Sequence, residues 1–300
     1  MRILCIHGLA INSHVFQART EKLRALLPED YSYEWLDGRY HVKPLDIFYD
    51  YHSGPYLSHT DGLTTDEVHG ALSRLQDYIR DNGPFDGVMG SCEVRNCAPP
   101  TTRTNVSVRQ GSWLAASLLL KHQMEDPTSP LPFQFAIFIS GSLPLSWSSS
   151  IGHDYLGVLT CEDPLSTDPS LWQRKGRDAK LEMERLSEIQ QRLKRDISPE
   201  GEIRLRKALD LVADPANSHL RPRAFHPDLH QDRLNLPTAH IWGREDFISG
   251  HAKQLLRLCN SAFAEVFEHK GGHDVPQSRE DSTRMSEVIQ KTIVRSQFAI

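Results

Sequence analysis

The chain has 300 residues, of which 39% are hydrophobic, and its 34 basic and 39 acidic residues give a formal net charge of -5. This length and apolar content suit one large core and leave little room for a second full domain. The charges are mixed along the chain without a basic stripe, which argues against a nucleic-acid partner. The cysteines are scattered and odd in number, and neither a signal peptide nor an apolar span is evident, so we expect a cytoplasmic protein that does not bind membranes.

Apolar runs that predict strands alternate along the chain with segments that predict helices. Residues 2–6 form a continuous apolar run that ends at His7 and Gly8, as expected of a buried parallel strand. Thr64 and Glu67 form a capping-box pattern ahead of apolar residues at helical spacing. The expected strands are residues 2–6, 31–36, 85–89, 133–140, 238–242 and 264–267, and the expected helices are 14–27, 64–82, 111–120 and 282–295.

Strands and helices in this order predict an α/β fold with a doubly wound, mostly parallel sheet, because parallel neighbours need a crossover connection. We expect residues 1–300 to form a single domain. Residues 165–235 are rich in charged side chains and lack sheet-like runs. They indicate either a helical cap inserted between two core strands or a solvated helical crossover.

Two loops that follow predicted strands contain the residues best suited to catalysis. Asp246 comes after the strand at 238–242, and His273 follows two glycines after the strand at 264–267. A catalytic imidazole needs a carboxylate that fixes its tautomer and a nucleophile from which it takes a proton. His273 fits the role of the imidazole and Asp246 that of the carboxylate, with Glu245 as the alternative acid. The order nucleophile, acid, histidine along the chain places the nucleophile between the strand at 85–89 and the helix at 111–120. No group of His, Cys and Asp has metal-ligand spacing, so we expect neither a metal nor a cofactor.

Six blocks spread over nearly the whole chain give the sequence a family resemblance. They are Ile3-Leu-Cys-Ile-His-Gly8, Phe85-Asp-Gly-Val-Met-Gly90, Gln110-Gly-Ser-Trp-Leu-Ala-Ala116, Phe138-Ile-Ser-Gly141, His240-Ile-Trp-Gly-Arg-Glu-Asp246 and Gly271-Gly-His273. In order and spacing, these blocks resemble the fungal serine hydrolases of the α/β-hydrolase superfamily, which include small esterases and polyketide-releasing thioesterases. The resemblance implies the α/β-hydrolase fold, a nucleophile–His273–Asp246 triad, and an oxyanion loop at His7, Gly8 and Leu9 in which a backbone N–H near Leu9 faces the substrate.

The chain departs from this family at the nucleophile elbow. The family reads Gly-Phe-Ser-Gln-Gly, whereas here Gly90 is followed by residues 91–110 before Gly111. An elbow holds its nucleophile in a tight turn directly between strand and helix, which twenty additional residues would release. We interpret about 91–110 as a disordered insertion, and our hypothesis is a retained intron or a mis-set splice boundary. In the chain as written, Ser91, Cys92 and Ser107 are the candidate nucleophiles, Cys92 standing where the strand side places the family serine.

The resemblance implies a hydrolase of carboxylic esters or thioesters. Its substrate would be a small-molecule acyl ester or a carrier-bound acyl thioester, and it would release or trim a polyketide or another acyl product after transient contact with a polyketide synthase. The alternative is a catalytically inactive binding protein that kept the fold and lost the serine elbow to the insertion. Acyl length, pathway and oligomeric state do not follow from the sequence.

Overall fold

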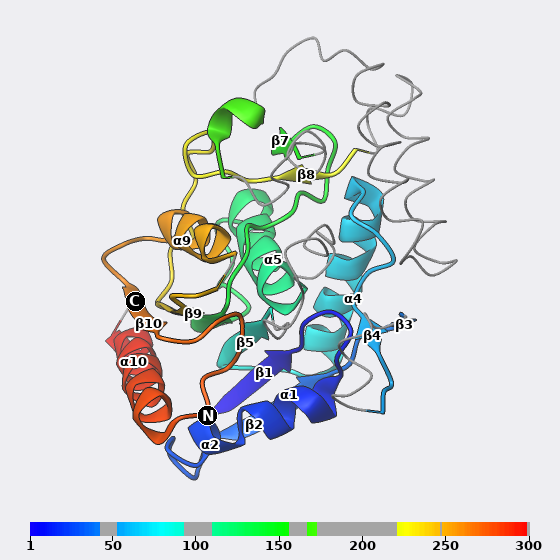
Figure 1. Cartoon of the computed structure of the whole chain (residues 1–300). Coiled ribbons are helices and arrows are strands. Elements are labelled where there is room, and N and C mark those ends of the chain that lie inside the picture. Colours follow the sequence, from blue (N-terminus) through cyan, green and yellow to red (C-terminus); the bar gives the residue numbers. More distant parts are fainter. Residues whose placement is uncertain (43–52, 93–109, 156–166, 173–220, 247, 299–300) are drawn as a thin grey trace.

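The protein is built on a six-stranded, wholly parallel sheet with the strand order β10-β9-β6-β5-β1-β2 (Figure 1). The computed structural model describes residues 1–42, 53–92, 110–155, 167–172, 221–246 and 248–298. The strands of this sheet are β1 (Arg2–Ile6), β2 (Ser32–Leu36), β5 (Gly87–Ser91), β6 (Phe135–Ile139), β9 (Thr238–Gly243) and β10 (Ala264–His269). The predicted doubly wound parallel sheet is confirmed.

Helices cover both faces of the sheet, and successive residues of a strand point to opposite faces. In β1, Leu4 and Ile6 join one buried apolar cluster, while Ile3 and Cys5 join the other. The first cluster includes residues of α4 (Thr65–Asn82), α5 (Gly111–Glu125) and α9 (Ser249–Arg257), and the second includes residues of α1 (Ser13–Arg19), α2 (Glu21–Arg24) and α10 (Arg279–Phe298). The central strands are therefore covered on both sides.

Helix α5 occupies the interior, as its sequence predicts. Every residue from Gly111 to Lys121 is buried. A helix that is apolar on all sides is stable only where other elements surround it, and α5 packs against β5, β1 and β6 as well as α4. Its first turn is thereby fixed at the carboxyl ends of β1 and β5.

One predicted helix differs in detail from the structure, and another is confirmed together with its cap. The helix expected at 14–27 is divided into α1 and α2 at Thr20, whose hydroxyl donates a hydrogen bond to the Phe16 carbonyl at 2.9 Å. Helix α4 starts with the predicted capping box between Thr64 and Glu67. Short antiparallel pairs that were not predicted join β3 (Tyr40–His41) to β4 (Leu57–Ser58) and β7 (His153–Asp154) to β8 (Arg223–Ala224).

The predicted cap or crossover at 165–235 is described only near its two ends. A short 3-10 helix, η3 (Pro169–Leu171), lies near its start, and β8 lies near its end. Residues 173–220, the larger part of this segment, lie outside the described residues. Strand β8 is a correction to the expectation that this segment lacks sheet structure, since two residues are too few to leave a pattern in the sequence.

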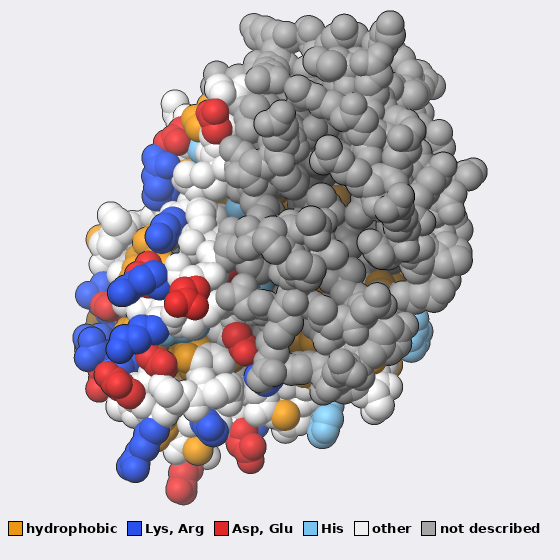
Figure 2. All heavy atoms as spheres, viewed as in Figure 1, with side chains coloured by type: hydrophobic (Ala, Val, Ile, Leu, Met, Phe, Trp, Pro, Cys, Tyr) orange, Lys and Arg blue, Asp and Glu red, His pale blue; other side chains and the backbone are white. Residues whose placement is uncertain are grey.

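The outer surface alternates in charge on the face shown in Figure 2, where Lys and Arg side chains lie among Asp and Glu side chains. One example is Arg257, which lies beside Asp228, and another is Arg244, whose Nε lies 3.0 Å from Glu268 Oε1. Among the described helices, none combines the length and the apolar character that crossing a bilayer requires.

Candidate active site

Asp246 and His273 meet at the carboxyl ends of two neighbouring strands. Asp246 follows β9 and His273 follows β10, which pair in parallel, so their loops leave the same edge of the sheet. His273 Nδ1 lies 2.8 Å from Asp246 Oδ2, and both side chains are completely buried. The nitrogen donates and the carboxylate accepts, which leaves Nε2 as the nitrogen that would exchange a proton with a nucleophile.

Backbone contacts between the two loops hold this pair in place. A Cβ atom at Gly243 would lie 2.0 Å from the Gly271 carbonyl oxygen, so glycine is required where the loops cross. The Glu245 N–H donates to the Gly271 carbonyl at 3.0 Å, and the Ile248 N–H donates to Asp246 Oδ1 at 2.9 Å. Both carboxylate oxygens of Asp246 are thus engaged, whereas Glu245, the alternative acid, is exposed.

The strand and the helix that flank the elbow remain in direct backbone contact. A Cβ atom at Gly111 would lie 2.1 Å from the Ile6 carbonyl oxygen and 2.7 Å from that of Ser91, and one at Gly90 would lie 2.5 Å from the Gly111 carbonyl oxygen. These approaches admit only glycine. The end of β5 and the start of α5 are therefore as close as a tight elbow requires, although residues 93–109 stand between them in the sequence.

The candidate nucleophiles fall in different places. Ser91 is the last residue of β5, and the Cys92 N–H donates to the Ile139 carbonyl at 3.0 Å; both residues are completely buried. The Ser91 hydroxyl has no hydrogen-bond partner among the described residues. Ser107 lies outside the described residues. The structure corrects both ends of the predicted insertion at 91–110. Ser91 belongs to β5, and Gln110 is buried at the N-cap of α5.

His7 holds the predicted oxyanion loop, which follows β1. Its Nε2 accepts a hydrogen bond from the Gly38 N–H at 2.9 Å, and its Nδ1 lies 2.6 Å from the Gly8 carbonyl oxygen. Burial lowers the pKa of His7 to about 4, so the ring is neutral at neutral pH and carries its proton on Nδ1. Within the described part of the chain, the backbone N–H groups of Leu9 and Gln110 donate to no acceptor.

The side chain of Gln110 forms a link that sequence reasoning missed. Its Oε1 accepts from the His59 N–H at 2.6 Å, and its Nε2 donates to Ser58 Oγ at 2.7 Å. The His59 ring in turn packs against the His7 ring in a tilted arrangement, with ring centroids 4.4 Å apart. The sequence signal was a glutamine directly before the helix glycine, but its partners lie 51 and 52 residues away and follow no motif.

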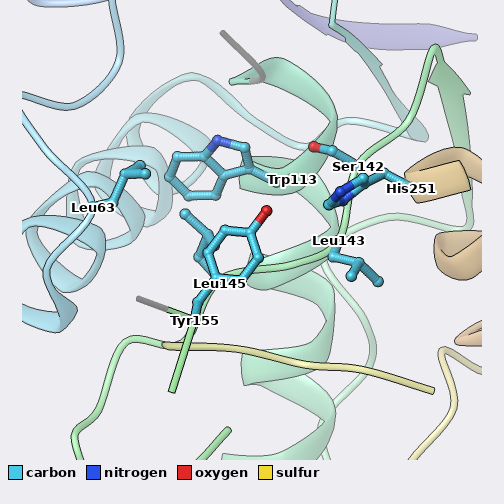
Figure 3. A pocket seen from close by; sticks show the side chains of 7 residues that line it. All are labelled: Leu63, Trp113, Ser142, Leu143, Leu145, Tyr155 and His251. Carbon is cyan, nitrogen blue, oxygen red and sulfur yellow. The ribbon is translucent and has the colours of Figure 1, made fainter. Parts of the chain in front are cut away.

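A pocket lies beside the start of α5 (Figure 3). It contains about 280 Å³ of empty space, part of it open to solvent. Its lining combines apolar, aromatic and polar side chains, namely Leu63, Trp113, Ser142, Leu143, Leu145, Tyr155 and His251. No pattern in the sequence indicates this pocket, because its residues come from five separate segments. Among the described residues, no three His, Cys, Asp or Glu side chains converge as metal ligands.

The parallel sheet, the acid after β9 and the histidine after β10 define an α/β-hydrolase-type protein. The chain belongs to the serine hydrolase (FSH1) family, whose model matches residues 1–93 and 108–285, and it is therefore a hydrolase. The gap between the two matched parts, residues 94–107, lies within the predicted insertion.

Fungal relatives match over almost the full length. The hydrolase FUB4 of Fusarium oxysporum f. sp. lycopersici is 28% identical over 98% of this chain and 99% of its own length. The esterase alnB of Emericella nidulans is 26% identical over 93% of this chain and 92% of its own. Among solved structures, the esterase RhEst1 from a Rhodococcus species aligns with a TM-score of 0.46 and 15% identity, covering 98% of this chain and 90% of that one.

Proposed function

We propose that the protein hydrolyses carboxylic esters or thioesters through a nucleophile at the β5–α5 elbow, with His273 as general base and Asp246 as its orienting acid. The buried 2.8 Å contact between these two side chains carries the proposal. A carboxylate that binds Nδ1 fixes the tautomer in which Nε2 accepts a proton, and it stabilises the imidazolium that forms. The esterase names of the relatives support this reaction class.

In the proposed mechanism, a serine hydroxyl attacks the carbonyl carbon while His273 Nε2 takes the hydroxyl proton. The carbonyl oxygen becomes an oxyanion, which the backbone N–H groups of Leu9 and Gln110 would bind; removal of one such donor typically costs about 3–4 kcal/mol of transition-state stabilisation. The protonated His273 gives its proton to the leaving alcohol or thiol. Water then repeats the cycle on the acyl enzyme and releases the acid.

The nucleophile depends on how the chain closes between Gly90 and Gly111. The contacts across these glycines support a tight elbow of the family form, Gly-Phe-Ser-Gln-Gly, with the additional residues as a retained intron or mis-set splice boundary. We define the closed-elbow variant as this chain with residues 91–109 replaced by Phe-Ser. In the chain as written, Ser91, Cys92 and Ser107 remain the candidate nucleophiles, of which Cys92 would act as a thiolate.

Within this proposal the substrate is a small-molecule acyl ester or a carrier-bound acyl thioester. We further propose that residues 1–300 form one domain in the cytoplasm, with residues 165–235 as a cap or crossover, and that release of a polyketide acyl chain from its synthase is the specific form of the reaction. The family resemblance supports this form. Ester and thioester substrates share the carbonyl chemistry, and the triad treats them alike.

The hydrolysis of p-nitrophenyl esters by the full chain and by the closed-elbow variant tests the proposal. We expect the closed-elbow variant to turn over and its His273→Ala form to lose at least 1,000-fold in kcat. The alternative function is that of a catalytically inactive binding protein, and the interrupted elbow of the present chain favours it. A folded closed-elbow variant without activity would support this alternative and contradict the hydrolase. Sequencing of the transcript across codons 88–113 tests the insertion: a message that encodes all of it in active protein contradicts the splice hypothesis.

A further inference from the structure

The pocket beside α5 has the position of an acyl-binding site. Trp113 lies two residues after Gly111 in the first turn of α5, and Ser142 lies three residues beyond the end of β6, the strand next to β5. An acyl group attached at the elbow would therefore extend into the space that these residues line. This step rests on the proposed function.

The walls of the pocket differ in chemistry from one side to the other. In Figure 3, Leu63 and the Trp113 indole lie on one side, while Ser142 and the His251 ring lie together on the other. Leu143 and Leu145 add further apolar wall. A purely hydrocarbon ligand would match only part of this lining.

Ser142 is the polar group that needs a ligand. Its residue is only 3% exposed, and its hydroxyl has no hydrogen-bond partner among the described residues. A buried hydroxyl without a partner is destabilising, so such groups occur mainly where a ligand or an ordered water completes them. The segment that follows is held firmly, because the Leu145 N–H donates to Ser117 Oγ of α5 at 2.8 Å.

We propose that this pocket binds an acyl group that carries a hydroxyl or keto oxygen, and that Ser142 forms a hydrogen bond with that oxygen. A site that hydrogen-bonds a ligand oxygen rejects the analogue without it, since the polar group of the protein is then left buried and unpaired. The enzyme therefore discriminates in favour of oxygenated acyl groups over plain hydrocarbon chains of the same shape.

Ser140 provides a matched control. It is two residues from Ser142, it is 1% exposed, and its hydroxyl likewise has no partner among the described residues. However, Ser140 does not line the pocket. Ser140→Ala therefore removes a buried, unpaired hydroxyl from the same loop, as Ser142→Ala does, but removes no group that would contact the ligand.

Binding of free acids tests the inference without any need for catalysis. Isothermal titration calorimetry on the full chain would compare 3-phenylpropanoic acid with its ortho-, meta- and para-hydroxyphenyl analogues, which place the hydroxyl at different distances from the carboxylate. We expect at least one hydroxylated acid to bind about tenfold more tightly, the range of one net hydrogen bond. Ser142→Ala should reduce this ratio to below about twofold, and Ser140→Ala should preserve it.

Three outcomes overturn the inference: equal binding of all four acids, no binding of any, or a ratio that Ser142→Ala leaves unchanged. The p-nitrophenyl esters of the same acids then separate the two proposals in the closed-elbow variant. Turnover of all esters at equal kcat/KM contradicts the pocket assignment and keeps the hydrolase. Selective binding of a hydroxylated acid without turnover of any ester keeps the pocket and contradicts the hydrolase.

Discussion

The substitution Asp246→Asn isolates the contribution of the acid, because it keeps the size of the side chain and removes its charge. In the structure the carboxylate binds His273 Nδ1 at 2.8 Å and the Ile248 N–H at 2.9 Å, and both side chains of the His–Asp pair are completely buried. An amide oxygen can keep the Ile248 contact. It cannot also hold the Nδ1 proton, so the imidazole adopts the tautomer that is unable to accept a proton at Nε2.

We expect Asp246→Asn to lower kcat of the closed-elbow variant about 10,000-fold, the scale of this change in a Ser-His-Asp triad. The free energy of unfolding should change by less than about 3 kcal/mol, since one buried hydrogen bond to a charged group is weakened. Initial rates with p-nitrophenyl acetate and urea denaturation measure the two effects. Glu245→Gln, at the exposed neighbouring position, should leave kcat within twofold. A loss of less than tenfold on Asp246→Asn, or an equal loss on Glu245→Gln, refutes the reasoning.

Three further substitutions examine the surroundings of the site. Gln110→Ala in the closed-elbow variant should lower kcat about tenfold with little change in KM, because its side chain holds the N–H that would bind the oxyanion; equal kcat would contradict this. Burial lowers the pKa of His240 from its ordinary value of 6.5 to about 3, so the unfolded chain binds one more proton than the folded chain as the pH falls below 6.5. That residue should therefore cost about 2 kcal/mol of stability between pH 7.5 and 5, and urea denaturation should show this loss removed by His240→Gln but not by His14→Gln at an exposed position. Gly111→Ala should lower the unfolding free energy by at least about 2 kcal/mol, since its Cβ meets a carbonyl of β1 at 2.1 Å, whereas Gly70→Ala in α4, whose Cβ meets only an arginine side-chain nitrogen at 3.3 Å, should not lower it.

The sequence predicts the sheet well because buried parallel strands are continuous apolar runs. Each predicted strand corresponds to a strand of the sheet, with ends that differ by a few residues. Asp246 and His273 were predicted from their positions after two strands and from the family resemblance, and the two strands are parallel neighbours in the structure. A pairing between loops at one edge of a parallel sheet is thus accessible to sequence reasoning.

Contacts between distant segments were not accessible in this way. The hydrogen bonds from Gln110 to Ser58 and His59 depend on how β4 lies against the start of α5, which no local pattern encodes. The pocket at Ser142 requires side chains from several loops to converge, and two-residue strands such as β7 leave no periodicity. The nucleophile was not fixed either, because the residues that separate Gly90 from Gly111 interrupt the only pattern that identifies it.

The most direct measurement is the mapping by mass spectrometry of the residue that a fluorophosphonate modifies. We expect the closed-elbow variant to be labelled on the serine that follows the new phenylalanine, and labelling to disappear in its His273→Ala form. Two results would contradict an esterase that acts through the buried His273–Asp246 pair. One is a folded closed-elbow variant that remains unlabelled, and the other is equal labelling of its His273→Ala form.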